Sequence, residues 1–589
     1  MKANLIFSIV FSFLLATGCS RPSKPYIFPA QKDKEFDTGS NIVFPELNEQ
    51  KINDLELLGR IWGFLKYHHP AIAQGKYNWD YELFRMLPEY LKTTDTTKRD
   101  EFLLRWIKKY GEVPECKTCK ETLADAFLKP DLSWIDKSDM NQQLKEKLKE
   151  IYQNRNQDKN FYIQLSAGIG QNPLFTNENP YKNMSYPDTG FRLLALYRYW
   201  NMIQYFYPNK YLTDKNWDTV LREYIPIFIL AKTELDYELA ALKLIGEIDD
   251  SHATLMEGRE KIDSLRGNWL APFQVRFIEN KLVVTKYYDP LLQEFAGLKV
   301  GDVITHINGK AVETIVDSVR EFYPASNEAA RLREIAKDML RSNKKTIFLN
   351  YVSSKQIKQK TLLLKDYGSM YNYIYGKDTT KCYKFISKNI GYITLKSIKI
   401  EDIEKIKNDF KDTKGIIIDI RNYPSDFFVF TLGSYFISKN TPFIKFTNGN
   451  PNNPGEFSFI PPIEIGEFSF IPPVEISASH EIYHGKLVVL VNEEAQSSSE
   501  YHAMAFRAGN NTTIIGSQTA GADGNVSEIY LPGGMKTWIS GIGVFYPDGR
   551  QTQRIGIVPD IVVKPTIKGI REGRDEVLEK AIEVINSGK

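Results

Sequence analysis

The stretch that decides the fold is VNEEAQSSSEYHAMAFRAG, residues 491–509, in which an apolar strand ends at three consecutive serines and a helical pattern follows. A strand, a sharp turn with Ser and a helix place a hydroxyl at the mouth of a sheet, beside the unpaired N–H groups of the helix start. Those groups favour the negative oxygen of an acyl-transfer intermediate. The same residues also fit a purely structural role, because Ser497 and Glu500 have the S-x-x-E spacing of a capping box.

Length and composition describe a large, ordinary folded protein. The chain has 589 residues, enough for three or four domains at roughly 150 residues each. Its 42% hydrophobic and 25% charged residues are typical of globular proteins. A net charge of +3 over this length gives no field that would attract nucleic acid, so we expect no nucleic-acid partner.

The N-terminus has the pattern of an export signal, with Lys2, an apolar run over residues 5–15 and small residues before Cys19. The run is too short for a stable membrane-spanning helix. It resembles a bacterial lipoprotein signal over residues 1–18, which implies a lipid anchor on Cys19 and a place in the cell envelope, on the periplasmic side of a bacterial membrane. A plain secretory signal with an incidental cysteine is the alternative. The polar residues 19–45 predict a flexible tether.

Two further cysteines, Cys116 and Cys119 in ECKTCK, have the spacing of metal ligands. A structural zinc site needs about four ligands, however, and the sequence has no second Cys or His pair of suitable spacing. We therefore expect no metal site and predict a local disulfide, as suits an oxidising compartment. A redox role is the alternative.

Two distant segments match each other in sequence. WGFLKYHHPAIAQGKYNWD begins at Trp62, and WNMIQYFYPNKYLTDKNWD begins at Trp200 with its Pro and its Asn-Trp-Asp at the same offsets. The identical spacing indicates an internal duplication. Apolar residues at three-to-four spacing predict helices in both copies, so we expect a helical repeat over residues 46–165 and a second over residues 185–265.

Short alternating strands follow, and AGLKVGDVITHINGKAV, residues 296–312, resembles a PDZ domain of bacterial proteases. Gly301-Asp302 and Asn308-Gly309 supply tight turns on either side of a buried strand. The resemblance implies a β-sandwich-like PDZ domain over residues 268–355 that binds extended chain ends by strand addition, through residues that the pattern does not identify. A purely structural β domain is the alternative.

The remaining chain predicts an α/β domain over residues 356–566 and a C-terminal helix over residues 567–589. Strands such as GIIIDI and KLVVLVN are apolar along their whole length and alternate with helices, which indicates a sheet covered on both faces. The tandem copy GEFSFIPPIEI and GEFSFIPPVEI, residues 455–476, predicts an extended flap or hairpin without a function of its own. The chain is thus expected to be a multidomain α+β protein.

Three motifs in order, NEEAQSSSEYHAMAFRAGNNTTIIGSQTAGADG, GIIIDIRNYPSD and RIGIVPDIVV, resemble the tail-specific, or C-terminal-processing, serine peptidases, a family that includes the tricorn core. With the PDZ-like segment, the resemblance covers roughly residues 247–563. It implies a peptidase core of the ClpP/crotonase type and hydrolysis of polypeptides through an acyl-enzyme without a cofactor.

Carried over by position, the family's nucleophile falls on Ser497, and Ser498 provides a backbone N–H to the oxyanion. The Lys that serves as base in the processing members is replaced by Ala522. Tricorn-like members use a His preceded by Ser, from a segment ahead of the PDZ domain, and this sequence has Ser251 and His252 there. The resemblance therefore implies His252 as the base, with Ser251 orienting it.

Two positions depart from the family pattern. The carboxylate that tricorn-like members place before the closing strand is replaced by Gln553. The glycine-rich oxyanion loop is replaced by a segment with Pro424, which lacks an N–H, so Ser425 is the expected second donor. We expect a serine endopeptidase; the alternatives are a pseudo-protease that binds peptides or envelope proteins and a hydrolase of another ester or amide.

Overall fold

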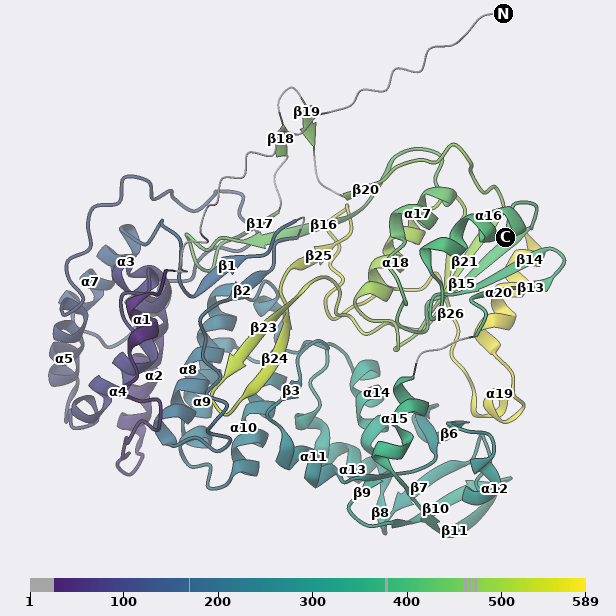
Figure 1. Ribbon diagram of the computed structural model, residues 1–589, viewed down its shortest axis with the longest axis horizontal. Coiled ribbons are helices and arrows are strands. Elements are labelled where there is room, and N and C mark those ends of the chain that lie inside the picture. The colour runs from purple at the N-terminus through teal and green to yellow at the C-terminus, as the bar shows by residue number, and fades with distance from the viewer. Residues whose placement is uncertain are drawn as a thin grey trace, which may run out of the picture.

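The computed structural model of the chain describes residues 26–168, 170–376, 380–459, 463–465, 468–470 and 474–588. The predicted signal peptide and Cys19 lie outside these residues. Figure 1 shows a helical unit formed by the N-terminal half, a β domain below, and an α/β unit beside them.

The helical unit contains both copies of the duplicated segment, and matching contacts hold each copy together. In the first, the Trp62 and Trp79 indoles donate to each other's carbonyl oxygens, at 3.1 and 2.8 Å; in the second, Trp200 and Trp217 do the same at 3.0 and 3.2 Å. Its helices are α1 (Pro29–Lys32), α2 (Glu49–His68), α3 (Pro70–Ala73), α4 (Trp79–Tyr90), α5 (Thr96–Lys108), α6 (Ser133–Lys137), α7 (Gln142–Gln153), α8 (Thr189–Phe206), α9 (Trp217–Ile229), α10 (Glu234–Gly246) and α11 (Glu260–Arg266). The identical pairing confirms that the two segments are structural equivalents.

The copies also exchange ion pairs. Arg60 on α2 donates to Asp218 on α9 at 3.0 Å, and its equivalent Arg198 on α8 donates to Asp80 on α4 at 2.6 Å. Each copy thus supplies the arginine for the other copy's aspartate. The Arg198–Asp80 pair is buried, and removal of one partner of a buried pair is strongly destabilising, so this pair holds the copies together.

The β domain is a sheet of order β11-β10-β7-β6-β5 with helices on its surface. Its elements are β5 (Phe273–Ile278), β6 (Lys281–Tyr287), β7 (Val303–Ile307), β8 (Lys310–Ala311), β10 (Thr346–Ser353), β11 (Gln356–Leu363), α12 (Leu292–Ala296), α13 (Val312–Val319) and α14 (Glu328–Asp338). The predicted boundary at residue 355 is wrong: β11 pairs with β10 along its whole length, and β12 (Lys365–Asp366) returns to β4 (Trp269–Leu270). Hydrogen bonding between these strands keeps residues 356–366 in this domain.

The α/β unit contains a six-stranded sheet whose strands are parallel apart from β13. The strands are β13 (Tyr383–Ser387), β14 (Ile390–Thr394), β15 (Gly415–Asp419), β21 (Lys486–Val491), β22 (Thr512–Gly516) and β26 (Ile561–Val562). Ile416 and Ile418 pack into a core with α16 (Ile403–Phe410), α17 (Val429–Gly433) and α18 (Ser498–Arg507), whereas Ile417 faces α20 (Glu576–Ser587). The expected sheet covered on both faces is confirmed. The predicted C-terminal helix is two helices, α19 (Ile567–Arg571) and α20.

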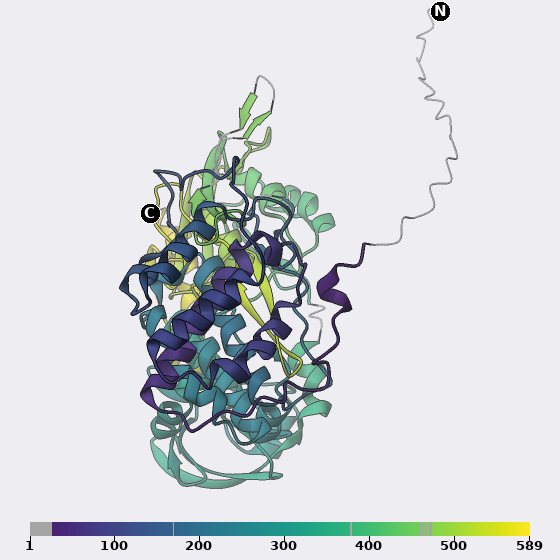
Figure 2. The same cartoon turned by 90° about the vertical axis from the view of Figure 1, so that its left-hand side faces the viewer.

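Shorter strands connect the units. β24 (Met535–Ser540) pairs with β23 (Val526–Leu531) and with β3 (Leu255–Glu257) of the helical unit, so the chain crosses the helices between β22 and β26 of the α/β sheet. β16 (Thr441–Gly449) pairs with β17 (Phe457–Phe459), β20 (Val474–Ile476) and β25 (Gly543–Phe545). In the tandem copy, β18 (Ile463–Ile465) and β19 (Phe468–Phe470) form the expected hairpin, which stands clear of the body in Figure 2.

Cys116 and Cys119 form the predicted disulfide, with Cα atoms 5.5 Å apart. None of the helices in the described ranges is both long and apolar enough to cross a bilayer.

Candidate active site

Ser497 occupies a strained turn between β21 and α18. Its φ of 56° and ψ of −120° are rare for a residue with a side chain, and such backbone strain costs on the order of 1–3 kcal/mol. The turn is held because the Ser497 N–H donates to Ala522 O at 2.9 Å. A serine on a sharp strand-to-helix turn, beside a helix N-terminus, is the arrangement of a nucleophile elbow.

Glu500 connects this turn to the glycine loop of residues 519–522. Its fully buried carboxylate accepts hydrogen bonds from the Ser497 N–H, the Thr519 hydroxyl, and the Gly521 and Ala522 N–H groups, at 3.3, 2.5, 2.9 and 3.0 Å. Burial raises the pKa of Glu500, and these hydrogen bonds oppose that shift. Because these four donors occupy the carboxylate, Glu500 stabilises the turn and the glycine loop and is not available as an acid or base.

His252 lies in the turn between α10 and β3, where a buried chain of hydrogen bonds fixes its imidazole. His252 Nδ1 lies 2.9 Å from Ser540 Oγ, and Ser540 Oγ lies 2.9 Å from Asp250 Oδ1. Asp250 also accepts from the Ser540 N–H at 2.6 Å and from the His252 N–H at 3.0 Å. The Ser540 hydroxyl has one proton, which it donates to the Asp250 carboxylate in a hydrogen bond. Its oxygen therefore accepts from His252 Nδ1–H. The Nε2 lone pair is left free.

The imidazole is well suited to act as a base. Burial lowers the pKa of His252, with the Asp250 charge opposing the shift, so the ring is neutral near neutral pH. Nε2 is buried and has no hydrogen-bond partner among the described residues, and Ser497 Oγ is not bonded to it there. The neighbours of the two residues do meet, because Gln496 Nε2 donates to Ser251 O at 3.1 Å. Catalytic hydrogen bonds are often long in the absence of substrate.

Ser251, which we expected to orient the imidazole, contacts other groups. Its hydroxyl donates to Ala520 O at 3.0 Å and accepts from the Ser326 N–H at 2.9 Å. It therefore ties the His252 turn to the glycine loop and to the β domain. Gln553 is buried, and its Nε2 has no partner in the described part of the chain. The carboxylate that supports the imidazole is Asp250, which the sequence comparison with tricorn-like members missed.

Of the two expected oxyanion donors, Ser498 and Ser425, one has a backbone N–H that is available and the other does not. Across the described ranges, the backbone N–H of Ser498, at the first position of α18, donates to no acceptor. The prediction for Ser425 is wrong for this structure: its N–H donates to Leu395 O at 2.9 Å, and its hydroxyl bonds Leu395 O and Ile398 O. The residue that replaces the family's glycine uses its polar groups to anchor the loop.

His502 also helps to shape the start of α18. Its Nδ1 lies 2.6 Å from Ser498 O, its Nε2 accepts from the Phe428 N–H at 3.4 Å, and burial lowers its pKa to about 4. Ser499 Oγ donates to Asn422 O at 2.8 Å. The start of α18 is thereby fixed to residues 421–428.

The β domain reaches into the same region through α14. Arg333 donates to Glu493 O at 2.6 Å and to Gln496 Oε1 at 2.7 Å, just before Ser497. At the cap of α14, Asn327 donates to Thr519 O at 2.9 Å. The Ser497 turn and the glycine loop are therefore both held by one helix of the β domain.

Comparisons with known proteins give a family match for the α/β unit and a similarity in fold. Residues 389–563 match peptidase family S41. A serine-to-alanine mutant of CPAF superposes with a TM-score of 0.53 at 14% identity, covering 68% of this chain and 98% of that one. Mature CPAF with lactacystin gives 0.50 at 13% identity, covering 68% and 99%. A putative peptidase from Parabacteroides merdae gives 0.41 at 17% identity, covering 68% and 96%.

No curated protein matches the sequence. At such low identities the CPAF structures establish similarity of fold, and the family match establishes the class of enzyme, whose substrates are polypeptides. Residues 389–563 therefore carry the match to peptidase family S41, and the class of enzyme that this match gives is a serine peptidase.

Proposed function

We propose that the protein is an exported serine endopeptidase in which Ser497 is the nucleophile and His252 the general base. The observation that carries this proposal is the Asp250–Ser540–His252 chain, which leaves the Nε2 lone pair free beside the strained Ser497 turn. A serine hydroxyl is a weak nucleophile until a neighbouring base accepts its proton. With Ala522 in place of the lysine, His252 supplies that base.

In the proposed mechanism, substrate binding brings Ser497 Oγ within reach of His252 Nε2. The imidazole takes the hydroxyl proton as Oγ attacks the scissile carbonyl, and then protonates the leaving amine. Water hydrolyses the acyl-enzyme by the reverse sequence. Asp250, at 3.8 Å from Nδ1, stabilises the transient imidazolium as Gln553 could not, because an amide carries no charge. Gln553 Nε2 makes no hydrogen bond within the described residues, so we assign it no part in orienting the imidazole.

The Ser498 N–H, together with the N-terminus of α18, would stabilise the oxyanion. With Ser425 engaged elsewhere, a second donor would require the 421–428 loop to shift. Each missing donor typically lowers the rate by about a hundredfold to a thousandfold, so turnover should be slow.

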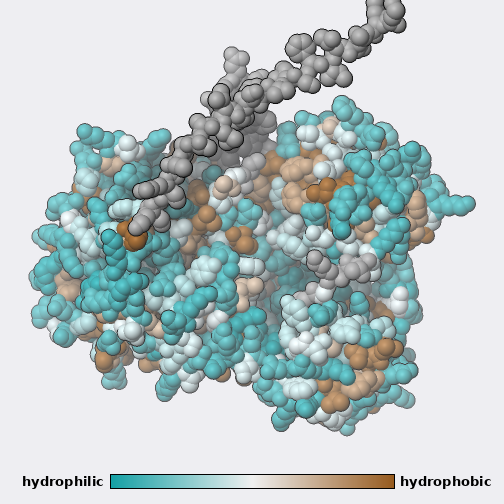
Figure 3. All heavy atoms as spheres, in the orientation of Figure 1, coloured by the Kyte–Doolittle hydropathy of each residue, from teal (hydrophilic) through white to brown (hydrophobic). Residues whose placement is uncertain are grey.

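An apolar surface beside the site supports binding of polypeptide side chains. Figure 3 shows apolar side chains gathered over α17. Phe427 and Phe430 are 47% and 43% exposed there, and the Phe427 ring lies 5.6 Å from the Tyr501 ring on α18. We further propose that residues 268–366 form a PDZ domain that binds chain ends, and that Cys19 carries a lipid anchor at the periplasmic side of a bacterial membrane after removal of residues 1–18.

Labelling with a fluorophosphonate tests the nucleophile directly. Wild-type protein should be labelled, Ser497→Ala should not, and His252→Ala should be labelled much more slowly. His480→Ala, which removes an exposed histidine of the flap region, is the matched control and should behave as wild type. Labelling that persists in Ser497→Ala would refute the assignment, and wild-type protein that binds peptides without being labelled would indicate a pseudo-protease.

A further inference from the structure

The two copies of the helical duplication differ in one charge, and in the second copy this difference lies beside a pocket. In the first copy, Lys66 is buried and its Nζ lies 2.6 Å from Glu178 Oε1, while Arg198 Nε lies 2.9 Å from Glu178 Oε2. All three side chains are fully buried. Two cations and the carboxylates of Glu178 and Asp80 therefore form a centre in which the charges balance.

In the second copy, the position equivalent to Lys66 is Gln204, and the ammonium comes instead from Lys210 in the loop after α8. Lys210 Nζ donates to Gln204 Oε1 at 2.8 Å. Asp218 is already paired with Arg60, and Asp131 accepts from the Ser133 N–H at 2.9 Å. No ion pair within the described ranges joins Lys210 to a carboxylate, so the counterpart of Glu178 is missing.

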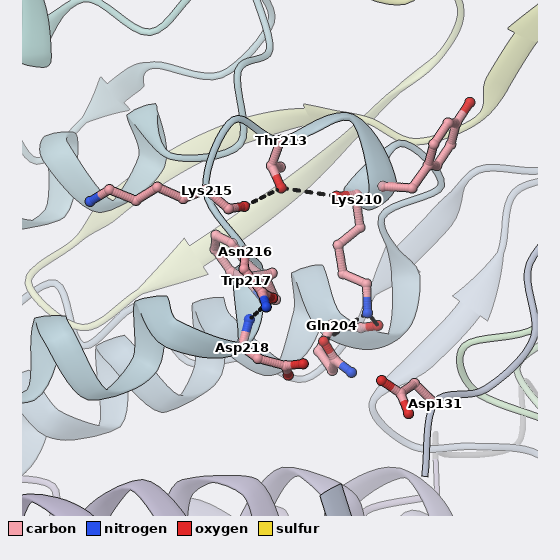
Figure 4. Close-up of a pocket in the computed structure, with 9 residues that line it drawn as sticks. Asp131, Gln204, Lys210, Thr213, Lys215, Asn216, Trp217 and Asp218 are labelled. Carbon is pink, nitrogen blue, oxygen red and sulfur yellow. Dashed lines mark hydrogen bonds between the residues drawn. The ribbon is translucent and has the colours of Figure 1, made fainter. Parts of the chain in front are cut away.

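A pocket of about 280 Å³ occupies this place. It is lined by Asp131, Gln204, Lys210, Lys215, Asn216 and Asp218, among others. Figure 4 shows the Lys210 side chain running toward Gln204, with Asp131 across from them, whereas Lys215 points away. Lys215 is held by Glu223 and Glu247 at 3.1 and 2.8 Å. Of the two lysines that line the pocket, Lys210 is therefore the one that has no carboxylate partner among the described residues and can offer its charge to an occupant.

We propose that this pocket binds the free carboxylate of a small ligand, of the size of one amino-acid residue, such as the C-terminal residue of a short peptide. The ligand carboxylate would pair with Lys210, as Glu178 pairs with Lys66 in the first copy. Asp131, on the opposite side, would accept from an N–H of the ligand. The volume lies just below the range of about 300–1,000 Å³ that is usual for small-molecule sites, so the pocket has room for about one residue.

The electrostatics of the empty pocket agree with an anionic occupant. Burial lowers the pKa of Lys210, and the charges of Asp218 and Asp131 only partly oppose it. A carboxylate beside Nζ would favour the charged ammonium, as Glu178 does for Lys66.

The pocket is connected to the catalytic unit by the loop that forms its wall. Tyr211 Oη donates to Gln551 Oε1 at 2.7 Å, and Arg554 donates to Asp214 at 2.7 Å. The Arg554 N–H in turn donates to Gly521 O, in the glycine loop of the active site, at 2.8 Å. A ligand in the pocket would therefore contact a loop that is linked through Arg554 to the glycine loop of the active site.

Calorimetry on the full-length protein tests the proposal independently of peptidase activity, with N-acetyl-alanine as the probe and its C-terminal amide as the neutral control. We expect the acid to bind and the amide to bind at least tenfold more weakly. Lys210→Gln should weaken binding of the acid by about tenfold or more, the effect of losing one hydrogen bond to a charged group. Lys210→Arg, which keeps the charge, should retain most of it, and Lys215→Gln should leave it unchanged.

Several results would overturn the proposal. The proposal is wrong if the acid does not bind at millimolar concentration, or if acid and amide bind equally. It is also wrong if Lys215→Gln loses as much affinity as Lys210→Gln. Binding of acetate or inorganic phosphate as tight as that of N-acetyl-alanine would show a general anion site without a role for Asp131. An unchanged melting temperature of Lys210→Gln confirms that any loss is local.

Discussion

Replacement of Asp250 by Asn should abolish most of the activity while leaving the fold in place. The carboxylate accepts from two backbone N–H groups and from the Ser540 hydroxyl; an Asn amide has one acceptor oxygen and turns an NH₂ group toward some of these donors. The Ser540 hydroxyl would then accept from the amide and donate to His252 Nδ1, which moves the imidazole proton to Nε2. The lone pair needed to activate Ser497 would be lost.

The structure also gives the magnitude of the charge effect. Asp250 Oδ1 and His252 Nδ1 are 3.8 Å apart. At an effective dielectric constant of about 20, a unit charge pair at this distance contributes about 4 kcal/mol to the imidazolium. At about 1.4 kcal/mol for each factor of ten, Asp250→Asn should lower kcat/KM by roughly a thousandfold.

The assay is kcat/KM for a fluorogenic peptide as a function of pH. Because Asp250 favours the imidazolium, its removal should also move the acid limb of the profile to lower pH, which a general loss of stability would not do. Asp249→Asn removes the same charge one residue earlier and is the control, since Asp249 contacts Arg331 and Arg554 rather than His252. A loss of kcat/KM below tenfold, or an equal loss in Asp249→Asn, would refute the role of the Asp250–Ser540–His252 chain.

Three further predictions concern pH and stability. Since burial lowers the pKa of His252 below its usual 6.5, the base stays neutral in mild acid, and the acid limb of wild-type kcat/KM should lie below pH 6.5; an inflection above 7 would contradict this. Glu500→Gln leaves about two buried donors unpaired and should lower the free energy of unfolding by about 2–6 kcal/mol in urea titration, whereas an unchanged midpoint would show that the loop is held otherwise. Arg198→Met breaks a buried pair and should cost about 3–5 kcal/mol in the same titration, with exposed Arg574→Met as an inert control.

The fold could be predicted because its signals are local. Fully apolar strands such as residues 415–419 and 486–491 bury both faces, and this is visible in sequence. The Trp and Asn-Trp-Asp spacing likewise predicted the duplication, since each copy makes its indole contacts within itself. The boundary at residue 355 was misplaced because β11 is largely exposed and polar, so it has no hydrophobic pattern that marks it as part of the sheet.

The site was harder to predict where it depends on contacts across units. Asp250 stands two residues before His252 and could have been considered, but its link to the imidazole runs through Ser540, and nothing in the sequence connects residues 288 positions apart. Ser425 was misassigned because sequence alignment shows which residue replaces a glycine and not where its N–H points. The pairing of Arg333 with Gln496 is equally invisible, since it joins two separate domains.

The division of the site between units has a consequence for how the chain comes to function. The family match begins at residue 389 and includes Ser540 but not its hydrogen-bond partner His252. His252 belongs to the helical unit. If the two residues act together, a fragment of the α/β unit alone would carry a nucleophile without a base. The newly made chain would be in the same position until its N-terminal and C-terminal halves dock through β3 and β24. Activity would therefore require the complete fold, in which β3 and β24 join the two parts of the site.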